Sequence, residues 1–336
     1  MKIQLQSLRV INCGPLRDVC IHFNTDGDSP VTLLAGANGS GKTTALELIV
    51  GLAEMLLPLS ELPPVRPTLL RADYAQLDFL VDRKNFSVFH GNKPDTTNLP
   101  GNSLGRIGTI GTFRQQQHGH LPGALKAQIN QQETYTTVDS FSDAPNDSEV
   151  ERPPLTVPSL LFFPHTRLLL TVTGDQMYKE AVAYQWVYFY QVTGQFKGSL
   201  DSYLVWLDYV EPDAYAKAIQ FLNDLDIDGK IFSMSRRDFK VVVETPNGGK
   251  HFLEGMSSGE QSILILLLEL RRRLVPHSIV LIDEIEISLH PAFQHRIVNG
   301  LKRLQEMIPF QLIVTSHSPT ILEAFGTQSA RILTQF

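Results

Sequence analysis

Alternating apolar and polar residues at the start of the chain predict two β-strands. The alternation covers residues 2–11 and 19–23, and the turn-forming residues Asn12 to Pro15 separate them. A continuous apolar run at 31–35 predicts a strand that is buried on both faces. Residues 44–57 then have the spacing of a helix, which a group of prolines ends.

The middle of the chain has a different composition. Residues 91–158 are rich in Gly, Asn, Gln, Ser, Thr and Pro, which predicts a flexible, loop-dominated segment. Apolar residues resume at 160–163, and helices are expected at 175–192, 200–208 and 212–225. This stretch is therefore expected to form a separate lobe.

The C-terminal third predicts a hairpin followed by alternating helices and strands. The hairpin comprises residues 240–245 and 251–253, joined by Pro-Asn-Gly-Gly. Residues 257–325 alternate helical spacing with apolar strands, which is typical of the α/β class. We therefore expect an α/β protein with N-terminal antiparallel strands and three segments: 1–84, an inserted, mainly helical lobe at 85–250, and 251–336.

The composition is that of an ordinary folded protein and excludes several classes. The chain has 336 residues, of which 43% are hydrophobic and 19% charged, with a net charge of −6. This charge excludes a uniformly basic nucleic-acid coat, although a local basic patch stays open. The two cysteines, Cys13 and Cys20, form no zinc motif or disulfide framework, and the longest apolar run, Ile263 to Leu268, is far shorter than the ~20 residues of a membrane span. We expect a cytoplasmic protein that does not insert into a membrane.

A glycine-rich motif before the first predicted helix carries the clearest chemistry. Residues 36–44 match G-x-x-x-x-G-K-[ST] in the strand-to-helix context of a P-loop. Glycines let backbone amides surround phosphate oxygens, and the helix dipole favours the anion. We expect Lys42 to reach the β- and γ-phosphates of ATP and Thr43 to bind Mg²⁺. The nucleotide-binding residues expected here are Asn38, Gly39, Ser40, Gly41, Lys42, Thr43 and Thr44.

Two acids follow an apolar strand predicted at 278–282. Asp283 lies where the strand ends, as expected of an acid that holds Mg²⁺ through its hydration shell. Glu284 is placed to polarise the attacking water as a general base. On its own the pattern also fits a buried strand that runs out into solvent, and the P-loop favours the catalytic interpretation.

A serine- and glycine-rich segment precedes the apolar helix that begins near Ile263. Ser257 and Glu260 fit a capping box, Ser-x-x-Glu. The same helix N-terminus, with Ser258 and the small Gly259, also fits an anion site for the γ-phosphate of a nucleotide held by another subunit. The two interpretations are compatible, because a helix end that binds phosphate still needs a cap when it is empty.

A histidine follows another apolar strand, predicted at 312–314. Ligand sites of α/β folds gather at such strand ends, so we expect His317 to sense or polarise the γ-phosphate, with a structural histidine as the alternative. The expected catalytic residues are thus Lys42, Glu284 and His317, and the expected metal-binding residues are Thr43 and Asp283.

The order of these motifs resembles that of ABC-type ATPases: P-loop, Ser-Ser-Gly-Glu-Gln, Asp-Glu and a late histidine. The resemblance implies ATP and Mg²⁺ as cofactors and a homodimer as the assembly. Two heads would sandwich two ATP molecules, each held by Lys42 and Thr43 of one chain and by Ser257–Gly259 of the other. Hydrolysis would separate the pair, because the bridging phosphate is lost.

A narrower resemblance lies in Asp283–Pro291, which is similar to the DE-x-E-x-x-LHP segment of OLD-type ATPases and, more distantly, of RecF-like and chromosome-maintenance (SMC-like) ATPases. Phe162–Arg167 also resembles a segment of that group at the Q-loop position, although no Gln stands there. Too few residues follow His317 for a TOPRIM domain, and no sustained heptads predict a long coiled coil. The group implies a stand-alone ATPase paired with a separate effector in DNA repair or anti-phage defence.

Other functions stay open from the sequence. The chain also fits the nucleotide-binding subunit of a transporter, or an ATP-bound scaffold that turns over slowly. Arg271–Arg273 and Arg236–Arg237 fit nucleic-acid contact, and the first group alternatively complements the dipole at a helix end. The aromatics between Tyr184 and Tyr190 favour a buried helix over base stacking. No catalytic metal other than Mg²⁺ is expected, because the scattered histidines lack nearby acids or cysteines.

Overall fold

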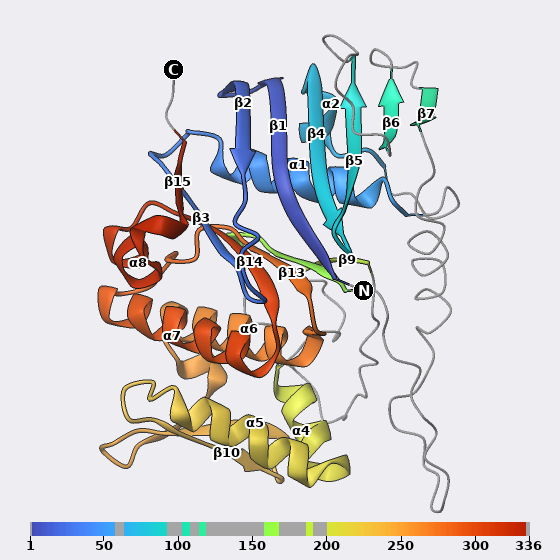
Figure 1. The fold of residues 1–336 in the computed structure, drawn as a ribbon. Helices are drawn as coiled ribbons and strands as arrows, with labels where there is room; N and C mark the ends of the chain where they lie inside the picture. The colour runs from blue at the N-terminus through green and yellow to red at the C-terminus, as the bar shows by residue number, and fades with distance from the viewer. Residues whose placement is uncertain are drawn as a thin grey trace, which may run out of the picture.

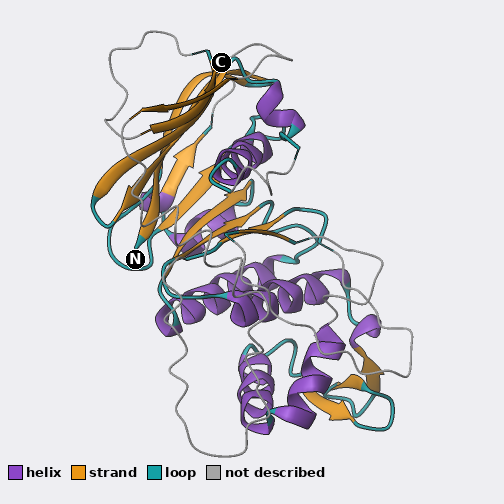
Figure 2. Ribbon diagram, turned by 90° about the vertical axis from the view of Figure 1, so that its right-hand side faces the viewer, coloured by secondary structure: helices purple, strands orange, loops and turns teal. Residues whose placement is uncertain are grey.

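The computed structural model contains two six-stranded sheets, a small three-stranded sheet and the helices that pack on them (Figure 1). Figure 2 shows the layers in order: the first sheet, a helical layer, the parallel sheet, a second helical layer and a small lobe. The expected α/β class with N-terminal antiparallel strands is confirmed. The structure describes residues 2–57, 64–92, 103–107, 114–118, 158–167, 186–190 and 200–333.

The first sheet contains the predicted N-terminal strands. Its order is β2-β1-β4-β5-β6-β7, and every described pair except β5–β6 is antiparallel. The strands are β1 (Ile3–Cys13), β2 (Leu16–His22), β4 (Tyr74–Val81), β5 (Lys84–Gly91), β6 (Ser103–Ile107) and β7 (Arg114–His118). Leu8, Leu77 and Val88 form one cross-strand row and pack with helix α1 (Lys42–Glu54) in a single core, which explains the alternation in the sequence.

The second sheet is parallel and brings several strand ends to one edge. Its order is β15-β3-β14-β13-β8-β9. The strands are β3 (Val31–Ala35), β8 (Leu160–Phe163), β9 (Val187–Phe189), β13 (Ser278–Ile282), β14 (Phe310–Ser316) and β15 (Ala330–Ile332). Because these strands run in one direction, the loops after β3, β8, β13 and β14 meet at the carboxyl edge, where ligands bind in α/β sheets.

Helices cover both faces of the parallel sheet (Figure 2). Leu281 belongs to the core around α1, whereas Val280 belongs to the core around α6 (Ser258–Arg273) and α7 (Pro291–Met307). Burial on both faces is why β13 reads as a continuous apolar run. The shorter elements are α2 (Pro67–Leu70), α8 (Pro319–Phe325) and the 3₁₀ turns Leu253–Gly255 and Thr327–Ser329. Within the described part of the chain, no helix combines the length and apolar character that crossing a bilayer requires.

A small lobe lies below α6 and α7 in the view of Figure 1. It contains α4 (Leu200–Val210), α5 (Pro212–Asp224), β10 (Ile231–Ser235), β11 (Lys240–Glu244) and β12 (Lys250–Phe252). The helices expected at 200–208 and 212–225 and the expected hairpin are confirmed. Arg236 of this lobe donates from Nε to Asp208 at 2.7 Å, so one of the proposed basic contacts is an intramolecular ion pair.

The region 85–250 departs from the expected single helical lobe. β5, β8 and β9 fall in this region of the sequence, yet they lie in the two large sheets. The described residues of 85–250 therefore contribute to the two large sheets as well as to the small lobe. Of the expected polar segment 91–158, the elements β6 and β7 belong to the first sheet, and most of the rest lies outside the described residues.

A helix was expected at 175–192, but Val187–Phe189 form the strand β9, so the prediction is wrong for these residues. Most other residues of this range lie outside the described part of the chain. β9 pairs in parallel with β8, and the rings of Phe162 and Phe189 lie 5.0 Å apart. Trp186 anchors the strand by donating from its indole to the carbonyl oxygen of Ala53 at 2.9 Å. Aromatic residues fit a half-buried sheet edge well, and this packing overrides helical spacing.

The arginines at the end of α6 pack against the protein instead of forming an exposed basic patch. Arg272 and Arg273 are buried and form ion pairs with Glu269 at 3.4 and 2.8 Å. Their guanidinium groups also lie over the rings of Tyr203 and Tyr188, at 4.7 and 4.0 Å from the ring centres. Of the two interpretations left open for these residues, nucleic-acid contact therefore does not apply to Arg272 and Arg273.

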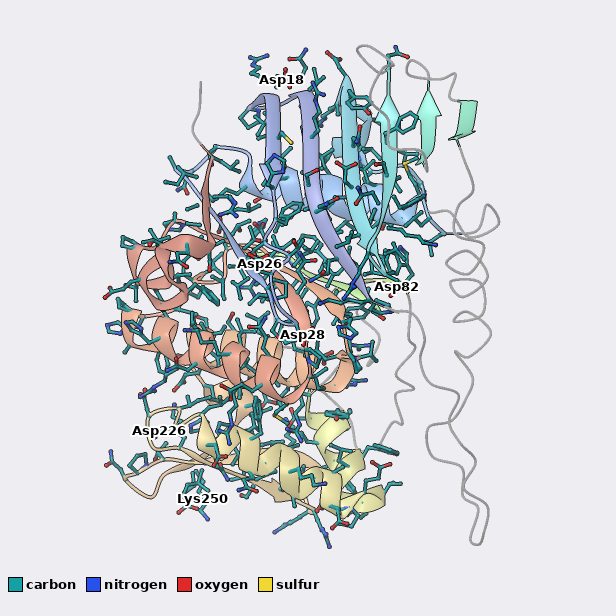
Figure 3. The ribbon with its side chains drawn as sticks, viewed as in Figure 1. Asp18, Asp26, Asp28, Asp82, Asp226 and Lys250 are labelled. Carbon is teal, nitrogen blue, oxygen red and sulfur yellow. The ribbon has the colours of Figure 1, made fainter. Side chains whose placement is uncertain are left out.

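Lys2 joins three surface segments near the N-terminus. Its backbone amide donates to Asp82 at 2.8 Å, and its ammonium donates to the carbonyl oxygen of Gly27 at 2.9 Å and to Asp28 at 3.1 Å. Figure 3 labels Asp28 and Asp82 near the N-terminal strands. Because the Lys2–Asp28 ion pair is exposed, it is expected to contribute only ~0–1 kcal/mol.

Asp201, at the start of α4, gives the small lobe a pH-dependent stability. Burial raises the pKa of Asp201 to about 6, although the amide of Val241 donates to its carboxylate at 2.8 Å. The stability that this group contributes is therefore full below pH ~4 and is lost as the pH rises through about 6.

Asp201→Asn keeps an oxygen that can accept the amide of Val241 and should stabilise the protein by about 3 kcal/mol at pH 7. Urea unfolding of both proteins from pH 4 to 7 checks this, and curves that stay parallel would contradict it.

Candidate active site

The P-loop connects β3 to α1 and leaves the start of the helix open to an anion. Its N-cap, Gly41, makes no side-chain hydrogen bond, and the first turn of α1 contains no acid. The amide groups of this turn therefore have no side-chain competitor for phosphate oxygens. Ser40 Oγ is buried and has no hydrogen-bond partner, which leaves a second polar group of the loop available to a ligand.

Two glycines of the loop occupy positions where a side chain does not fit. A Cβ on Gly36 would lie 2.6 Å from the carbonyl oxygen of Leu333 and 2.7 Å from Ser40 Oγ. Gly41 has a left-handed φ of 95°, and its Cβ would lie 2.7 Å from Leu16. The loop is thus fitted closely between β15 and the start of β2, and glycine is required for that fit.

Lys42 places its ammonium inside the curve of the loop. Its Nζ donates to the carbonyl oxygens of Gly36 at 2.8 Å and Ala37 at 2.9 Å, and the residue is buried. This is the region in which the motif holds the β- and γ-phosphates. The other expected nucleotide-binding residues lie in the loop or in the first turn of α1: Asn38, Gly39 and Thr44.

Thr43 and Asp283 are far apart in sequence but meet beside the P-loop. Thr43 Oγ1 lies 3.1 and 3.0 Å from the two carboxylate oxygens of Asp283, whose side chain is fully buried. A hydroxyl and a carboxylate suit Mg²⁺, which typically takes one or two protein ligands and completes its shell with water and phosphate oxygens. The described residues contain no group of three His, Cys, Asp or Glu that would form an all-protein metal site. The pair therefore fits Mg²⁺ bound together with a nucleotide.

Two further side chains hold the Asp283 carboxylate. Thr315 Oγ1 donates to Oδ1 at 2.7 Å, and His165 Nδ1 lies 3.1 Å from Oδ2. Such contacts fix the orientation of a metal-binding carboxylate. Sequence reasoning assigned neither role, although both residues lie at or just after the ends of strands that flank β13. That position becomes a signal only when the order of the strands is known.

Glu284 has a backbone conformation that is rare for its residue type. Its φ is 45°, in the left-handed region, and its amide donates to Thr315 Oγ1 at 2.7 Å. A non-glycine residue held in this region carries strain and is frequent at functional sites. Glu284 is partly exposed, so water can reach the expected general base.

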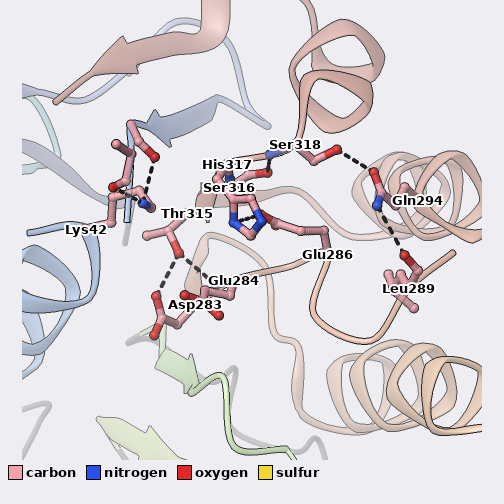
Figure 4. A network of polar contacts seen from close by, with 12 residues as sticks. Lys42, Asp283, Glu284, Glu286, Leu289, Gln294, Thr315, Ser316, His317 and Ser318 are labelled. Carbon is pink, nitrogen blue, oxygen red and sulfur yellow. Dashed lines mark hydrogen bonds and ion pairs between the residues drawn. The ribbon is translucent and has the colours of Figure 1, made fainter. Parts of the chain in front are cut away.

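His317 is oriented by an acid that the sequence analysis gave no role. Glu286 Oε1 accepts the backbone amide of His317 at 2.6 Å and lies 2.8 Å from its ring Nδ1. Nε2 is therefore the ring nitrogen that stays available to a ligand. Figure 4 shows this contact, which follows β14, close to Asp283 and Glu284 after β13 and to Lys42 at the start of α1.

Ser257 caps α6, as the sequence predicts. Ser257 Oγ accepts the amide of Glu260 at 3.4 Å, and the carboxylate of Glu260 accepts the amide of Ser257 at 2.9 Å. Lys230 also donates to Glu260. A Cβ on Gly259 would lie 2.5 Å from the carbonyl oxygen of Ser288, so glycine permits close contact with the segment after β13. The capping box is confirmed, and the anion-binding role stays a prediction.

The structure thus brings most of the expected site residues to one edge of the parallel sheet. The P-loop, Asp283, Glu284 and His317 lie together there (Figure 4). Ser257–Glu260 lie at the start of α6, beside the segment that follows Glu284. The arrangement therefore places groups that suit a phosphate-bearing ligand and a divalent cation beside a partly exposed carboxylate.

Comparison with known proteins agrees with this geometry. A family model described as "AAA domain, putative AbiEii toxin, Type IV TA system" matches residues 129–323, and one described as "AAA domain" matches residues 7–52. The retron Vc95 probable ATPase of Vibrio cholerae serotype O1 biovar El Tor is 31% identical over 127 residues, which are 34% of this chain and 23% of that protein. The retron Ec83 probable ATPase of Escherichia coli is 34% identical over 111 residues, which are 30% of this chain and 20% of that protein.

One further relative and one solved structure are also similar to this chain. The Septu protein PtuA of Bacillus thuringiensis is 25% identical over 131 residues, which are 35% of this chain and 32% of that protein. The aligned segments thus span about a fifth to a third of the curated relatives they match. The structure of an SMC head domain from Thermotoga maritima aligns with 96% of this chain and with 92% of that chain. The sequence identity is 15% and the TM-score is 0.47. Because the match over residues 129–323 includes more than half of the sequence, the chain belongs to this AAA-domain family and, with its P-loop at residues 36–44, is a P-loop ATPase.

Proposed function

We propose that the protein binds Mg-ATP at the P-loop and hydrolyses it. Lys42 and the loop amides hold the phosphates, and Thr43 and Asp283 hold Mg²⁺, which neutralises charge on the phosphate oxygens. Glu284 accepts a proton from the attacking water, and His317 contacts the γ-phosphate through Nε2. The observation that carries the proposal is the Thr43–Asp283 contact, because it joins two distant motifs directly beside Glu284.

We further propose that ATP binding drives two copies of the chain to engage through their heads. Ser257 and Ser258 are exposed at the N-terminus of α6, where they are accessible to a γ-phosphate held by a second copy. Loss of that phosphate on hydrolysis would remove the bridge between the copies. The Gly259–Ser288 contact links this surface to the segment that contains Glu284 in the same chain.

The biological setting that we infer is cytoplasmic phage defence or DNA repair, in which a separate effector protein acts with this ATPase. The names of the relatives support an ATPase that works within a larger system: two are retron probable ATPases and one is a Septu protein. Engagement of the heads would then control the effector.

Lys42→Ala tests the nucleotide site. Loss of the charged hydrogen bonds to phosphate should weaken ATP binding by about 10- to 100-fold, since such bonds are worth about 1.5–3 kcal/mol. Titration calorimetry measures the affinity, and phosphate release measures turnover. Lys302→Ala is the matched control, because this exposed lysine on α7 contacts the carbonyl oxygen of Ala324. Equal ATP affinity in the two variants would contradict the proposed site.

A further inference from the structure

Arg167 is a buried charge for which the proposed catalytic steps have no use. It follows β8, is 7% exposed and has its Nε buried without a hydrogen-bond partner. Burial lowers the pKa of Arg167 to about 10, and the nearby charge of Asp283 opposes this shift. Burying a guanidinium group with an unsatisfied donor costs folding free energy. A contribution to stability therefore does not explain why this charge is buried. Its other contacts therefore need an explanation.

The guanidinium of Arg167 binds the backbone of both acids that follow β13. Nη1 donates to the carbonyl oxygen of Asp283 at 2.7 Å and to that of Pro164 at 3.0 Å. Nη2 donates to the carbonyl oxygen of Glu284 at 3.0 Å. The planar fork thus spans two consecutive peptide units and ties them to the end of the neighbouring strand.

These contacts fix Glu284 from one side, and Thr315 fixes it from the other. The amide of Glu284 is bound by Thr315 Oγ1 from β14, and its carbonyl oxygen is bound by Arg167 from the segment after β8. Between these bonds Glu284 holds its left-handed φ of 45°. A residue keeps such a conformation only when its surroundings enforce it. The direction of the Glu284 carboxylate follows from this conformation.

We propose that Arg167 is a positioning residue for hydrolysis: by binding the carbonyl oxygens of Asp283 and Glu284, it holds Glu284 in the left-handed conformation that directs its carboxylate to the attacking water. This inference rests on the proposed function. The role requires a fork, because one group must reach two carbonyl oxygens. A lysine in the same place carries the charge but cannot reproduce this geometry.

Arg167→Met and Arg167→Lys test the proposal. A small misplacement of a catalytic group can cost about 100-fold in rate, so we expect kcat to fall about 100-fold for Met and about tenfold for Lys. The Kd for ATP should change less than about threefold, because the P-loop is untouched. In the Glu284→Gln background, Arg167→Met should cause no further loss. Arg66→Met is the matched control: it removes a two-bond contact with Glu54 at the far end of α1 and should leave kcat unchanged.

Hydrogen exchange separates this inference from the proposed function. The peptide 283–289 should exchange faster in both Arg167 variants than in the wild type, whether or not the wild type hydrolyses ATP. Wild-type turnover that Glu284→Gln abolishes supports the proposed function independently of Arg167. If Arg167→Met does not fold, Arg167→Lys decides. A kcat of Arg167→Met within twofold of the wild type, or unchanged exchange at 283–289, would overturn the proposal. So would a loss of kcat on adding Arg167→Met to Glu284→Gln that equals its loss in the wild-type background.

Discussion

Glu284→Gln is expected to reduce ATP hydrolysis by about 10²- to 10⁴-fold and to leave ATP binding intact. Gln has nearly the same shape as Glu but cannot accept a proton from the attacking water. The groups expected to hold the nucleotide, Lys42 and Thr43, are on a different element and keep their contacts. Loss of turnover with retention of ATP is therefore the expected signature of a missing general base.

Phosphate release and calorimetric ATP binding measure the two effects of Glu284→Gln separately. Glu306→Gln is a suitable control, because Glu306 is an exposed residue near the end of α7 and lies outside the site. Hydrolysis by Glu284→Gln within tenfold of the wild-type rate would assign the base to another group.

Glu269→Ala is expected to destabilise the protein by about 3–5 kcal/mol. The carboxylate of Glu269 lies in the interior at 1% exposure, and Arg273 donates to it at 2.8 Å. Arg272 forms a second contact at 3.4 Å. Removal of this carboxylate takes away the counter-charge that Glu269 supplies to two buried guanidinium groups, and the stacking on Tyr188 and Tyr203 compensates only part of this cost.

Urea unfolding at pH 7 measures the effect of Glu269→Ala. Glu323→Ala on α8 provides the comparison, because that side chain is exposed and its loss should cost less than about 0.5 kcal/mol. A destabilisation below 1 kcal/mol for Glu269→Ala would show that the aromatic rings and other contacts alone support the two arginines.

The parts of the fold and the site that could be predicted are those whose signal is local in the sequence. The apolar runs at 31–35 and 278–282 are strands buried on both faces, and burial on two faces leaves no polar position in the run. The glycines that the P-loop requires, such as Gly36 and Gly41, lie close together in the sequence, so the motif can be recognised from one short segment. Asp283 and Glu284 follow their strand directly. Local physical constraints therefore located most residues of the candidate site.

The residue roles that the sequence did not reveal are those that arise from the order of the strands in the sheet. His165, Arg167 and Thr315 contact the acids after β13 only because β8 and β14 are its neighbours in the sheet. These strands are separated along the chain, and a single sequence contains no signal of their adjacency. Arg167 has the further difficulty that it binds backbone carbonyls, which leave no pattern of side chains to recognise.

The errors in the middle of the chain have the same origin. Aromatic spacing around Tyr188 suggested a helix, whereas pairing with β8 makes residues 187–189 an edge strand. Likewise, the inserted lobe that includes the polar segment 91–158 was expected to begin at residue 85, whereas β5 pairs with β4 along its full length. Sheet pairing between distant segments overrides local preference in both cases.

The most direct test of ATP-driven head engagement is the solution mass of wild type and Glu284→Gln by light scattering, each with and without Mg-ATP. We predict that Glu284→Gln is a monomer of 37.6 kDa without nucleotide and doubles its mass with saturating Mg-ATP. The wild type should show a smaller, transient increase, because hydrolysis separates the pair. A Glu284→Gln mass that does not change when bound ATP saturates the site would contradict head engagement.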